Sequence, residues 1–450
     1  MHLLRLFGLA MIYCLYKAQR RVPIMLIEFS VQNATSIKDE MILSAETGER
    51  LSRLKETNTI RENNGSLLKN LIIIGPNGSG KTNIINALKL MRSMVLNDPD
   101  KITTSLPYNP FRLNPLSAKA PTKFQVKFNY GNQTFQYSFS YVSNAIVAEK
   151  LTQVLKTTER TIFAREDQNY PVLDEELEKV AANTKKNSLF LFNAQKANIP
   201  AAIAVLEWFQ KDLVFVNGKN IIPDQLTELM DDKRIKNEFL RFLRFADFNI
   251  IDVKVRDIPL SLPEEIKKIM TTLQPEIDLP DTRKELYASH KQYDGNGNVI
   301  GTEEIPLTQE SRGTQKIFLI ALSIINAHLN GNGKTILFDE FDDSLHFELS
   351  KALIEIFNSK QNRNQFILTT HELQLLNSEL RTDQIYLVEK DFQGRSSLYS
   401  VFDFKDSKNT ARHDVQYMKR YIEGRFGSLP QIDVDEMLSA LNASNPPARK

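Results

Sequence analysis

The sequence predicts an α/β protein with a mixed β-sheet, and three kinds of segment support this fold class. Residues 71–74, 335–338 and 365–369 are short and mostly apolar, as expected of strands that are covered on both faces. Residues 123–157 instead alternate between apolar and polar positions, which is typical of an antiparallel sheet. Helical spacing over 174–248 adds a third part, so we expect a mixed sheet, an antiparallel lobe and a helical insertion.

The first third of the chain is predicted to contain strands at residues 24–31, 40–45 and 71–74. The last of these leads into a glycine-rich turn, after which a helix is expected over 82–95. Residues 97–121 are rich in proline, asparagine and serine, so they are predicted to form a loop.

Alternation with period two predicts strands over 123–128, 133–141 and 145–157, and Tyr130-Gly131-Asn132 supplies the first turn. We expect these strands to form an antiparallel meander. Residues 174–248 carry apolar residues at helical spacing, which predicts a helical segment.

The rest of the chain is predicted to alternate between strands and helices. Asp294-Gly295-Asn296-Gly297 is a hairpin signal between strands at 283–293 and 299–305. The remaining predicted elements are strands at 250–255, 335–338, 365–369, 385–389 and 398–402, helices at 264–273, 313–329 and 347–357, and a frayed tail over 442–450.

The composition is that of an ordinary globular protein of 450 residues, 42% hydrophobic and 25% charged. The 57 lysines and arginines nearly balance 55 acidic residues, so the net charge of +2 does not by itself indicate a nucleic-acid partner. A lone cysteine, Cys14, excludes a disulfide framework and a cysteine-based metal cluster. Because such cysteine usage is typical of reducing compartments, we expect a cytoplasmic protein.

The first 24 residues differ from the rest of the chain. Residues 3–16 form a mostly apolar stretch that contains Arg5, and further basic residues follow it. The stretch is short for a transmembrane helix and lacks the cleavage pattern of a signal peptide. Three interpretations stay open, namely an extension ahead of a start at Met25, a helix that packs on the protein or a partner, and a membrane anchor. We do not expect a stable association with membranes.

Residues 75–82 read Gly-Pro-Asn-Gly-Ser-Gly-Lys-Thr, which matches the P-loop pattern G-x-x-x-x-G-K-[ST] between a strand and a helix. The glycines let backbone N–H groups converge on a phosphate, and the start of the helix adds a favourable dipole. The lysine would reach the β- and γ-phosphates of ATP and act in catalysis, and the threonine would bind Mg²⁺. The alternative is a glycine-rich β-turn. The predicted nucleotide-binding residues are Gly75, Asn77, Gly78, Ser79, Gly80, Lys81 and Thr82.

Ile336-Leu337-Phe338-Asp339-Glu340 is an apolar strand that ends in two carboxylates, which is the Walker B pattern. We expect Asp339 to hold Mg²⁺, usually through water, and Glu340 to orient or deprotonate the attacking water. The alternative is a strand end with two solvated acids. His371 follows the next apolar strand and is expected to contact the γ-phosphate and the attacking water, although a lone histidine after a strand is commonly a surface residue.

Ser311-Arg312-Gly313-Thr314 stands just before the helix predicted at 313–329. The Ser311 hydroxyl, Gly313 and the helix N-terminus would form an anion site. The alternative is a simple helix N-cap, a role in which serine is common.

The order of these four motifs resembles the ATP-binding-cassette (ABC) ATPase class, in the branch that holds the SMC, Rad50 and RecF proteins. Within this branch the chain resembles AAA-type ATPases of abortive-infection and restriction-linked loci, the RloA/AbiL-type proteins. Residues 25–40, 383–390 and 424–430 carry the similarity to that group's opening and closing segments, so the resemblance covers about residues 25–432. Ala34 and Thr35 depart from the group, which usually has Phe-Arg there.

The resemblance implies a P-loop NTPase with an ABC-like head that binds Mg-ATP and hydrolyses it slowly. It implies a switch or scaffold in bacterial anti-phage defence, by abortive infection, that controls a separate effector or toxin protein. It also implies a homo-oligomer, at least a dimer, in which Ser311 and Gly313 of one copy contact ATP held by Lys81 of another. Asp343 falls in the segment that corresponds to the D-loop.

The resemblance does not place the Mg-sensing glutamine of the class. Asn109-Pro110-Phe111-Arg112 occupies the corresponding region without a glutamine, and Gln125 lies inside a predicted strand. The insertion lacks sustained heptads, which argues against a long coiled coil that tethers DNA. No TOPRIM-like acidic set follows His371, which argues against a fused nuclease.

Two other functions stay open. The first is a DNA-maintenance or repair clamp similar to RecF, in which nucleic acid would be bound. Residues 240–245 mix aromatic with basic side chains and could stack on nucleic acid, or they could form an amphipathic helix whose apolar face lies in the core. The second is a scaffold that binds ATP and sequesters a toxin.

The predicted organisation has five parts. An N-terminal extension spans 1–24, an ATPase lobe with the P-loop and the antiparallel β subdomain spans 25–173, and a helical insertion spans 174–281. The second part of the ATPase head, with the Ser-x-Gly signature, Walker B and the histidine, spans 282–432, and a C-terminal tail spans 433–450.

Overall fold

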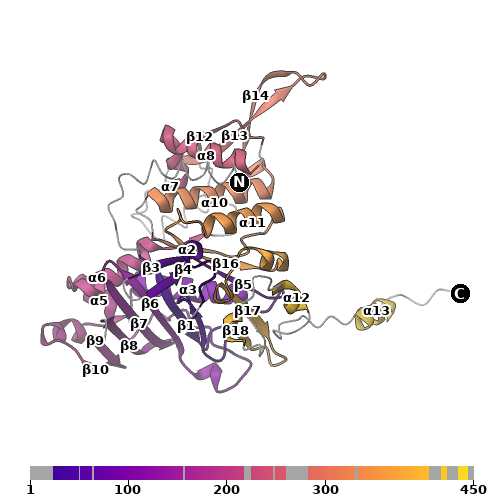
Figure 1. Cartoon of the computed structure of the whole chain (residues 1–450). Helices are drawn as coiled ribbons and strands as arrows, with labels where there is room; N and C mark the ends of the chain where they lie inside the picture. The colour runs from indigo at the N-terminus through magenta and orange to yellow at the C-terminus, as the bar shows by residue number, and fades with distance from the viewer. Residues whose placement is uncertain are drawn as a thin grey trace.

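The computed structural model describes residues 24–49, 51–62, 65–155, 158–216, 224–246, 249–259, 282–329, 333–404, 417–422 and 434–443. The helix predicted at 264–273 lies outside the described residues, as do residues 1–23 and the segment at 424–430. The described part contains two large sheets, helices that cover them and a projecting hairpin (Figure 1).

The antiparallel lobe is a seven-stranded sheet with the order β10-β9-β8-β7-β6-β1-β2. Phe124 of β6 faces Phe139 of β7, and their rings pack edge to face with centroids 5.5 Å apart. The predicted meander is therefore confirmed, and two strands that were not predicted extend it. The strands are β1 Leu26–Gln32, β2 Met41–Ser44, β6 Thr122–Tyr130, β7 Gln133–Val142, β8 Ala145–Val154, β9 Glu159–Glu166 and β10 Asn169–Val172.

The mixed sheet has six strands in the order β11-β15-β16-β5-β17-β18. The first five are parallel, and β18 adds an antiparallel edge. Because parallel strands point the same way, the loops that follow β5, β15 and β16 all start at the carboxyl ends of the strands, on the same side of the sheet. The strands are β5 Asn70–Ile74, β11 Leu213–Val216, β15 Thr335–Phe338, β16 Gln365–Thr370, β17 Ile385–Lys390 and β18 Ser396–Ser400.

The helices confirm the predicted α/β class. The longer ones are α3 Lys81–Leu96, α6 Pro200–Glu207, α8 Lys233–Phe245, α10 Arg312–Leu329, α11 Phe347–Phe357 and α13 Val434–Ala443. The shorter ones are α2 Lys55–Asn58, α4 Glu178–Ala182, α5 Phe190–Lys196, α7 Asp224–Thr227 and α12 Tyr417–Ile422. Among the described residues, no helix is both long and apolar enough to span a bilayer.

The mixed sheet is buried on both faces, and β5 shows how its residues divide between two cores. Leu71 and Ile73 belong to the core that includes α3 and the antiparallel sheet. Ile72 and Ile74 belong to the core that includes α8, α10 and α11. Side chains alternate along a strand, so a wholly apolar strand is what a sheet between two cores requires.

The segment 174–248 was predicted to be helical, but it also contains a strand. Leu213–Val216 is strand β11, which pairs in parallel with β15 and forms the edge of the mixed sheet. A four-residue apolar run fits a helix or a strand equally well, and only the neighbouring strand decides between them. The division into domains stays a prediction.

Helix α8 carries the aromatic and basic run at 240–245. Leu240 and Leu243 are buried in the core with α10, whereas Arg241 is exposed and pairs with Glu238. This arrangement confirms the amphipathic helix as the structure of that run.

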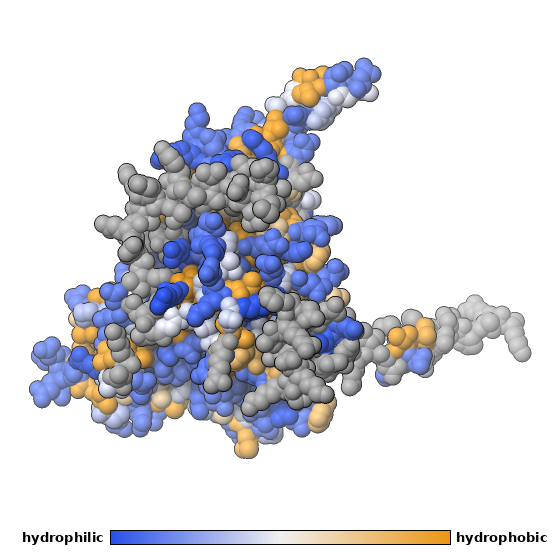
Figure 2. Space-filling view, in the orientation of Figure 1, coloured by the Kyte–Doolittle hydropathy of each residue, from blue (hydrophilic) through white to orange (hydrophobic). Residues whose placement is uncertain are grey.

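The third sheet is antiparallel and three-stranded, and its terminal hairpin projects from the body as an arm (Figure 1). It consists of β12 Asp252–Pro259, β13 Thr282–Tyr293 and β14 Val299–Pro306, which confirms the predicted hairpin. The Asp294 carboxylate closes the turn by accepting hydrogen bonds from the N–H groups of Asn296 and Asn298. Val299 and Ile300, at the start of β14, are exposed. Figure 2 shows hydrophobic residues among hydrophilic ones at the end of the arm.

Three local differences from the predictions remain. Strand β18 begins at Ser396, two residues before the predicted strand, and a short 3₁₀ helix spans Val401–Asp403. Val434–Ala443 is helical, although the tail had been predicted from residue 433. A small hairpin of β3 Thr59–Glu62 and β4 Gly65–Leu68 was not predicted.

Candidate nucleotide site

The P-loop connects the end of β5 to the start of α3. Gly78 and Gly80 have φ angles of 78° and 110°, in the left-handed region that favours glycine. A Cβ atom on Gly80 would also collide with the hydroxyl of Ser396. Lys81 Nζ donates to the carbonyl oxygens of Gly75 at 2.6 Å and of Pro76 at 3.0 Å. The lysine is thus held within the loop, where the P-loop pattern predicts it.

The Ser79 hydroxyl supports the prediction of a phosphate site. Its oxygen is buried and has no hydrogen-bond partner among the described residues. Because buried hydroxyl groups are nearly always hydrogen-bonded, an unpartnered one in a P-loop fits a ligand that supplies oxygen acceptors. A phosphate group has this chemistry.

The Walker B carboxylate lies next to the P-loop threonine. Thr82 Oγ1 donates to Asp339 Oδ1 at 3.2 Å, and Thr369 Oγ1 donates to the same oxygen at 2.5 Å. Hydroxyl and carboxylate oxygens are the ligands that Mg²⁺ prefers. The residues therefore fit a magnesium ion, which Thr82 and Asp339 would hold.

Glu340 has an unusual backbone conformation. Its φ angle is 48°, which costs a residue with a side chain about 1–2 kcal/mol. The N–H of Glu340 donates to Thr369 Oγ1 at 2.8 Å, and its carbonyl oxygen accepts from Lys316 Nζ at 2.9 Å. The side chain is exposed. Burial lowers the pKa of Lys81, while the nearby carboxylates of Glu340 and Asp339 oppose this shift.

The loop after β15 contains one further acidic residue, Asp342, that the sequence analysis did not select. Asp342 is 8% exposed, and its Oδ1 atom has no hydrogen-bond partner among the described residues. Burial raises the pKa of Asp342, and a hydrogen bond from Thr370 and the proximity of His371 oppose this rise. His371 itself is exposed, immediately after β16.

The structure places the predicted Ser-x-Gly signature at the start of α10. Ser311 Oγ accepts a hydrogen bond from the Thr314 N–H at 3.1 Å, so the serine caps this helix. A Cβ atom on Gly313 would lie 2.6 Å from the carbonyl oxygen of Ser344. The first turn of α10 therefore packs directly on the loop that follows Walker B in the same chain. Ser311 and Asp343 are exposed, and their contacts with a second copy stay a prediction.

Two serines behind the P-loop were also missed. Ser396 Oγ donates to the carbonyl oxygen of Ser79 at 2.6 Å and lies 2.7 Å from Ser36 Oγ. Asn83 Nδ2 of α3 donates to Ser36 Oγ at 2.7 Å. These contacts join the loop after β1 and the start of β18 to the P-loop. The residues are more than 300 positions apart, and no local pattern marks them.

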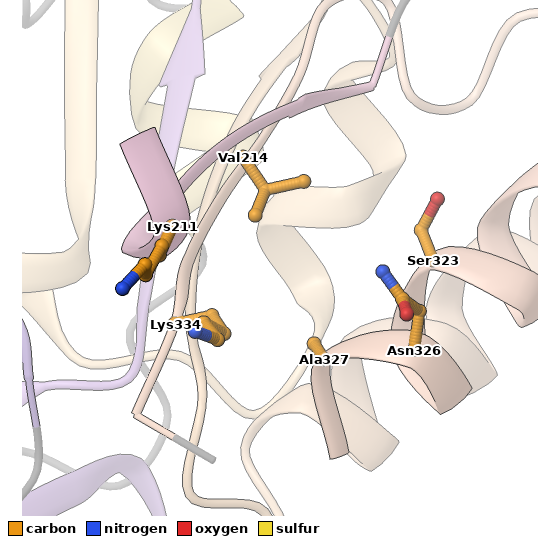
Figure 3. Close-up of a pocket in the computed structure, with 6 residues that line it drawn as sticks. All are labelled: Lys211, Val214, Ser323, Asn326, Ala327 and Lys334. Carbon is orange, nitrogen blue, oxygen red and sulfur yellow. The ribbon is translucent and has the colours of Figure 1, made fainter. Parts of the chain in front are cut away.

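A separate cavity of about 300 Å³ lies between α10 and the strands β11 and β15 of the mixed sheet (Figure 3). Lys334 comes just before β15, so this cavity is at the opposite ends of the strands from the P-loop. Lys334 pairs with Asp212, and Lys211 pairs with Glu207 at 2.5 Å. The lysine charges are thus balanced within the protein. The lining residues are Lys211, Val214, Ser323, Asn326, Ala327 and Lys334.

Comparison with known families agrees with this site. A family model described as "AAA domain, putative AbiEii toxin, Type IV TA system" matches residues 71–377, from β5 to the segment after β16. The chain belongs to this family. The predicted P-loop ATPase of AAA type is thereby confirmed, whereas the RloA/AbiL type stays a prediction.

Individual relatives of this AAA-domain protein are distant. A Helicobacter pylori (strain ATCC 700392 / 26695) protein named ATP/GTP phosphatase is 24% identical over 352 residues, which cover 73% of this chain and 85% of that protein. An SMC head bound to the C-winged helix domain of ScpA is 14% identical with a TM-score of 0.41, covering 84% and 97% of the two chains. The SMC head domain from Thermotoga maritima is 13% identical with a TM-score of 0.38, covering 84% and 98%.

Proposed function

We propose that this protein binds Mg-ATP and hydrolyses it slowly. The observation that carries the proposal is the hydrogen bond between Thr82 and Asp339. It places an oxygen of the P-loop next to an oxygen of Walker B, so that both could bind one Mg²⁺ ion. The buried hydroxyl of Ser79, which has no hydrogen-bond partner in the described part of the chain, adds a group suited to a phosphate oxygen. The name of the Helicobacter pylori relative, ATP/GTP phosphatase, supports hydrolysis of the nucleotide.

Each residue of the site has a proposed role. Thr82 and Asp339 hold Mg²⁺, which when bound neutralises charge on the phosphates. Lys81 binds the β- and γ-phosphates. Glu340 orients the attacking water and accepts its proton, and His371 contacts the γ-phosphate and that water.

The biological role proposed here is a switch or scaffold in anti-phage defence, of the RloA/AbiL abortive-infection type, that controls a separate effector in the cytoplasm. The family description, "AAA domain, putative AbiEii toxin, Type IV TA system", supports a place in such defence systems, and the control of a separate effector is our proposal. ATP would be shared between at least two copies, with Ser311 and Gly313 of one copy against the nucleotide of the other. The exposed position of Ser311 at the N-terminus of α10 leaves it accessible to such a neighbour.

Light scattering of the Glu340→Gln protein tests this function. With Mg-ATP the variant should bind nucleotide without turnover and shift from the chain mass of 51.6 kDa to twice that mass. Lys81→Ala is the matched control, which should neither bind ATP nor change mass. Hydrolysis by Glu340→Gln at the unmutated rate would show that Glu340 is not the base. A monomer under both conditions would contradict the role of Ser311 between copies.

The alternative of a DNA clamp gains no support from three exposed basic residues of the insertion, which are ion-paired. On the insertion, Arg241 pairs with Glu238, and both Lys254 and Arg256 pair with Glu304. Paired charges attract phosphates less than free ones. Stimulation of the ATPase by DNA would nevertheless establish the clamp, so DNA is added in a parallel assay.

A further inference from the structure

Lys316 is a buried lysine on the second turn of α10, and only 5% of its surface is exposed. Its Nζ atom donates to the carbonyl oxygen of Glu340 at 2.9 Å. Among the described residues, the hydrogen-bond acceptor of the Lys316 ammonium group is this carbonyl oxygen. A lysine is rarely buried without a role that needs its charge or its donors.

The acidic loop that follows β15 acts on the charge of Lys316. Burial lowers the pKa of Lys316, and the surrounding carboxylates of that loop oppose this shift. The positive charge of Lys316 is therefore attracted to the group of acids that includes the predicted magnesium ligand and base. These acids are Asp339, Glu340, Asp342 and Asp343.

The contact with Lys316 also bears on the backbone of Glu340. Glu340 has the left-handed φ angle of 48°, a conformation that a residue with a side chain adopts only when its surroundings hold it there. Two side chains from different elements contribute to this, beside the backbone N–H of Asp343, which donates to the Glu340 carbonyl oxygen at 3.1 Å. Thr369 of β16 accepts the N–H of Glu340, and Lys316 of α10 donates to its carbonyl oxygen. Loss of either contact would weaken the support for this conformation and so let the carboxylate shift.

Helix α10 is fixed to this loop at a second point. Gly313 leaves no room for a side chain, since a Cβ atom would lie 2.6 Å from the carbonyl oxygen of Ser344. The start of α10, capped by Ser311, thus contacts the loop at Glu340 through Lys316 and at Ser344 through Gly313. A displacement of the first turn of α10 would therefore reach Glu340 through groups that are packed together or hydrogen-bonded.

We propose that Lys316 is a positioning residue that holds Glu340 in its left-handed conformation and thereby aims its carboxylate at the nucleotide. Contact of a ligand with the start of α10 is transmitted by the same lysine to the catalytic loop of its own chain. This inference rests on the proposed function, because it takes Glu340 as the base.

Steady-state kinetics of Lys316→Met test the proposal. The value of kcat should fall about 10–100-fold, as expected when a reacting group is misplaced by about 1 Å. The affinity for a fluorescent ATP analogue should stay within about twofold, since the phosphate-binding residues are unchanged. Lys316→Arg, which retains a charged donor, should restore most of the rate.

Lys69→Met is the matched control. Lys69 is also buried, at 2% exposure, and within the described part of the chain it also donates to a backbone carbonyl oxygen, that of Ser359 at 2.6 Å. It precedes β5, at the end of the strand away from the P-loop. This variant should keep the unmutated kcat. An equal loss of kcat in Lys69→Met would mean that any buried lysine has this effect, and would overturn the proposal.

A double variant separates positioning from general damage to the fold. In Glu340→Gln, the further change Lys316→Met should not reduce the residual rate, because the group it positions is gone. Additive losses, or a large loss of ATP affinity, would show a merely structural role. If Lys316→Met does not fold by circular dichroism, Lys316→Gln replaces it with the same expected loss of kcat.

The two proposals can fail separately. If Glu340→Gln hydrolyses ATP at the unmutated rate, the proposed function is wrong whatever Lys316 does. If Glu340→Gln is inactive while Lys316→Met keeps the unmutated kcat, the function stands and the positioning role is wrong.

Discussion

Replacement of Lys69 by methionine should stabilise the protein, and the gain should depend on pH. The Lys69 ammonium is buried next to β5, and among the described residues its hydrogen-bond acceptor is the Ser359 carbonyl oxygen rather than a carboxylate. Burial, together with the charges of Arg363 and Lys360, lowers the pKa of Lys69 to about 8 from its ordinary value of 10.5. The amine of Lys69 therefore binds its proton less tightly in the folded protein than in the unfolded chain.

The magnitude follows from the two pKa values of Lys69, 10.5 in the unfolded chain and about 8 in the fold. Below pH 8 the lysine is protonated in both states, and the shift lowers the free energy of unfolding by about 3 kcal/mol. As pH rises above 8 the folded state loses its proton first, so this penalty shrinks to about 1 kcal/mol at pH 9.5. Loss of the hydrogen bond offsets about 1 kcal/mol. Lys69→Met should thus gain about 2 kcal/mol at pH 7 and about nothing at pH 9.5.

Urea unfolding at pH 7 and pH 9.5 measures this difference. The single tryptophan, Trp208, is fully buried in the core with α3 and reports unfolding by fluorescence. Lys150→Met, at an exposed lysine on β8, is the control and should change stability by less than about 0.5 kcal/mol at both pH values. A Lys69→Met protein that is less stable than the unmutated protein at pH 7, or equally altered at both pH values, would refute the reasoning.

Three further predictions concern the nucleotide site and the antiparallel lobe. Gly80→Ala should weaken ATP binding at least about tenfold in a fluorescence titration because of its φ angle of 110°. Gly131→Ala, strained at 59° in the turn after β6, should leave binding intact. Asp339→Asn should abolish the stimulation of hydrolysis by Mg²⁺, and a normal magnesium titration would exclude it as a ligand. Glu149→Gln should lower the free energy of unfolding by about 3 kcal/mol, because the buried Glu149 accepts two backbone N–H groups and faces Arg165 at 3.7 Å. Unchanged urea unfolding would contradict that last prediction.

Local pattern predicted most of the elements around the site. Strand β5, the P-loop and α3 follow one another within about 27 residues, and each has a strong local signal: an apolar run, a run of glycines and a helical period. The same holds for β15 with its two terminal carboxylates. Strand β11 was missed because a short apolar run inside a helical region takes its conformation from the strand beside it.

By itself, the sequence determined which chemistry is available: the phosphate-binding loop, the paired carboxylates at 339 and 340, and their order along the chain. Only the tertiary structure decided which other groups serve that chemistry. Thr369 reaches Asp339 because β16 lies between β15 and β5, and Lys316 reaches Glu340 because α10 packs over the same edge of the sheet. Ser396 supports the P-loop from a hairpin more than 300 residues away. Such contacts depend on how strands and helices pack against each other, and the local sequence pattern around each residue does not specify that packing.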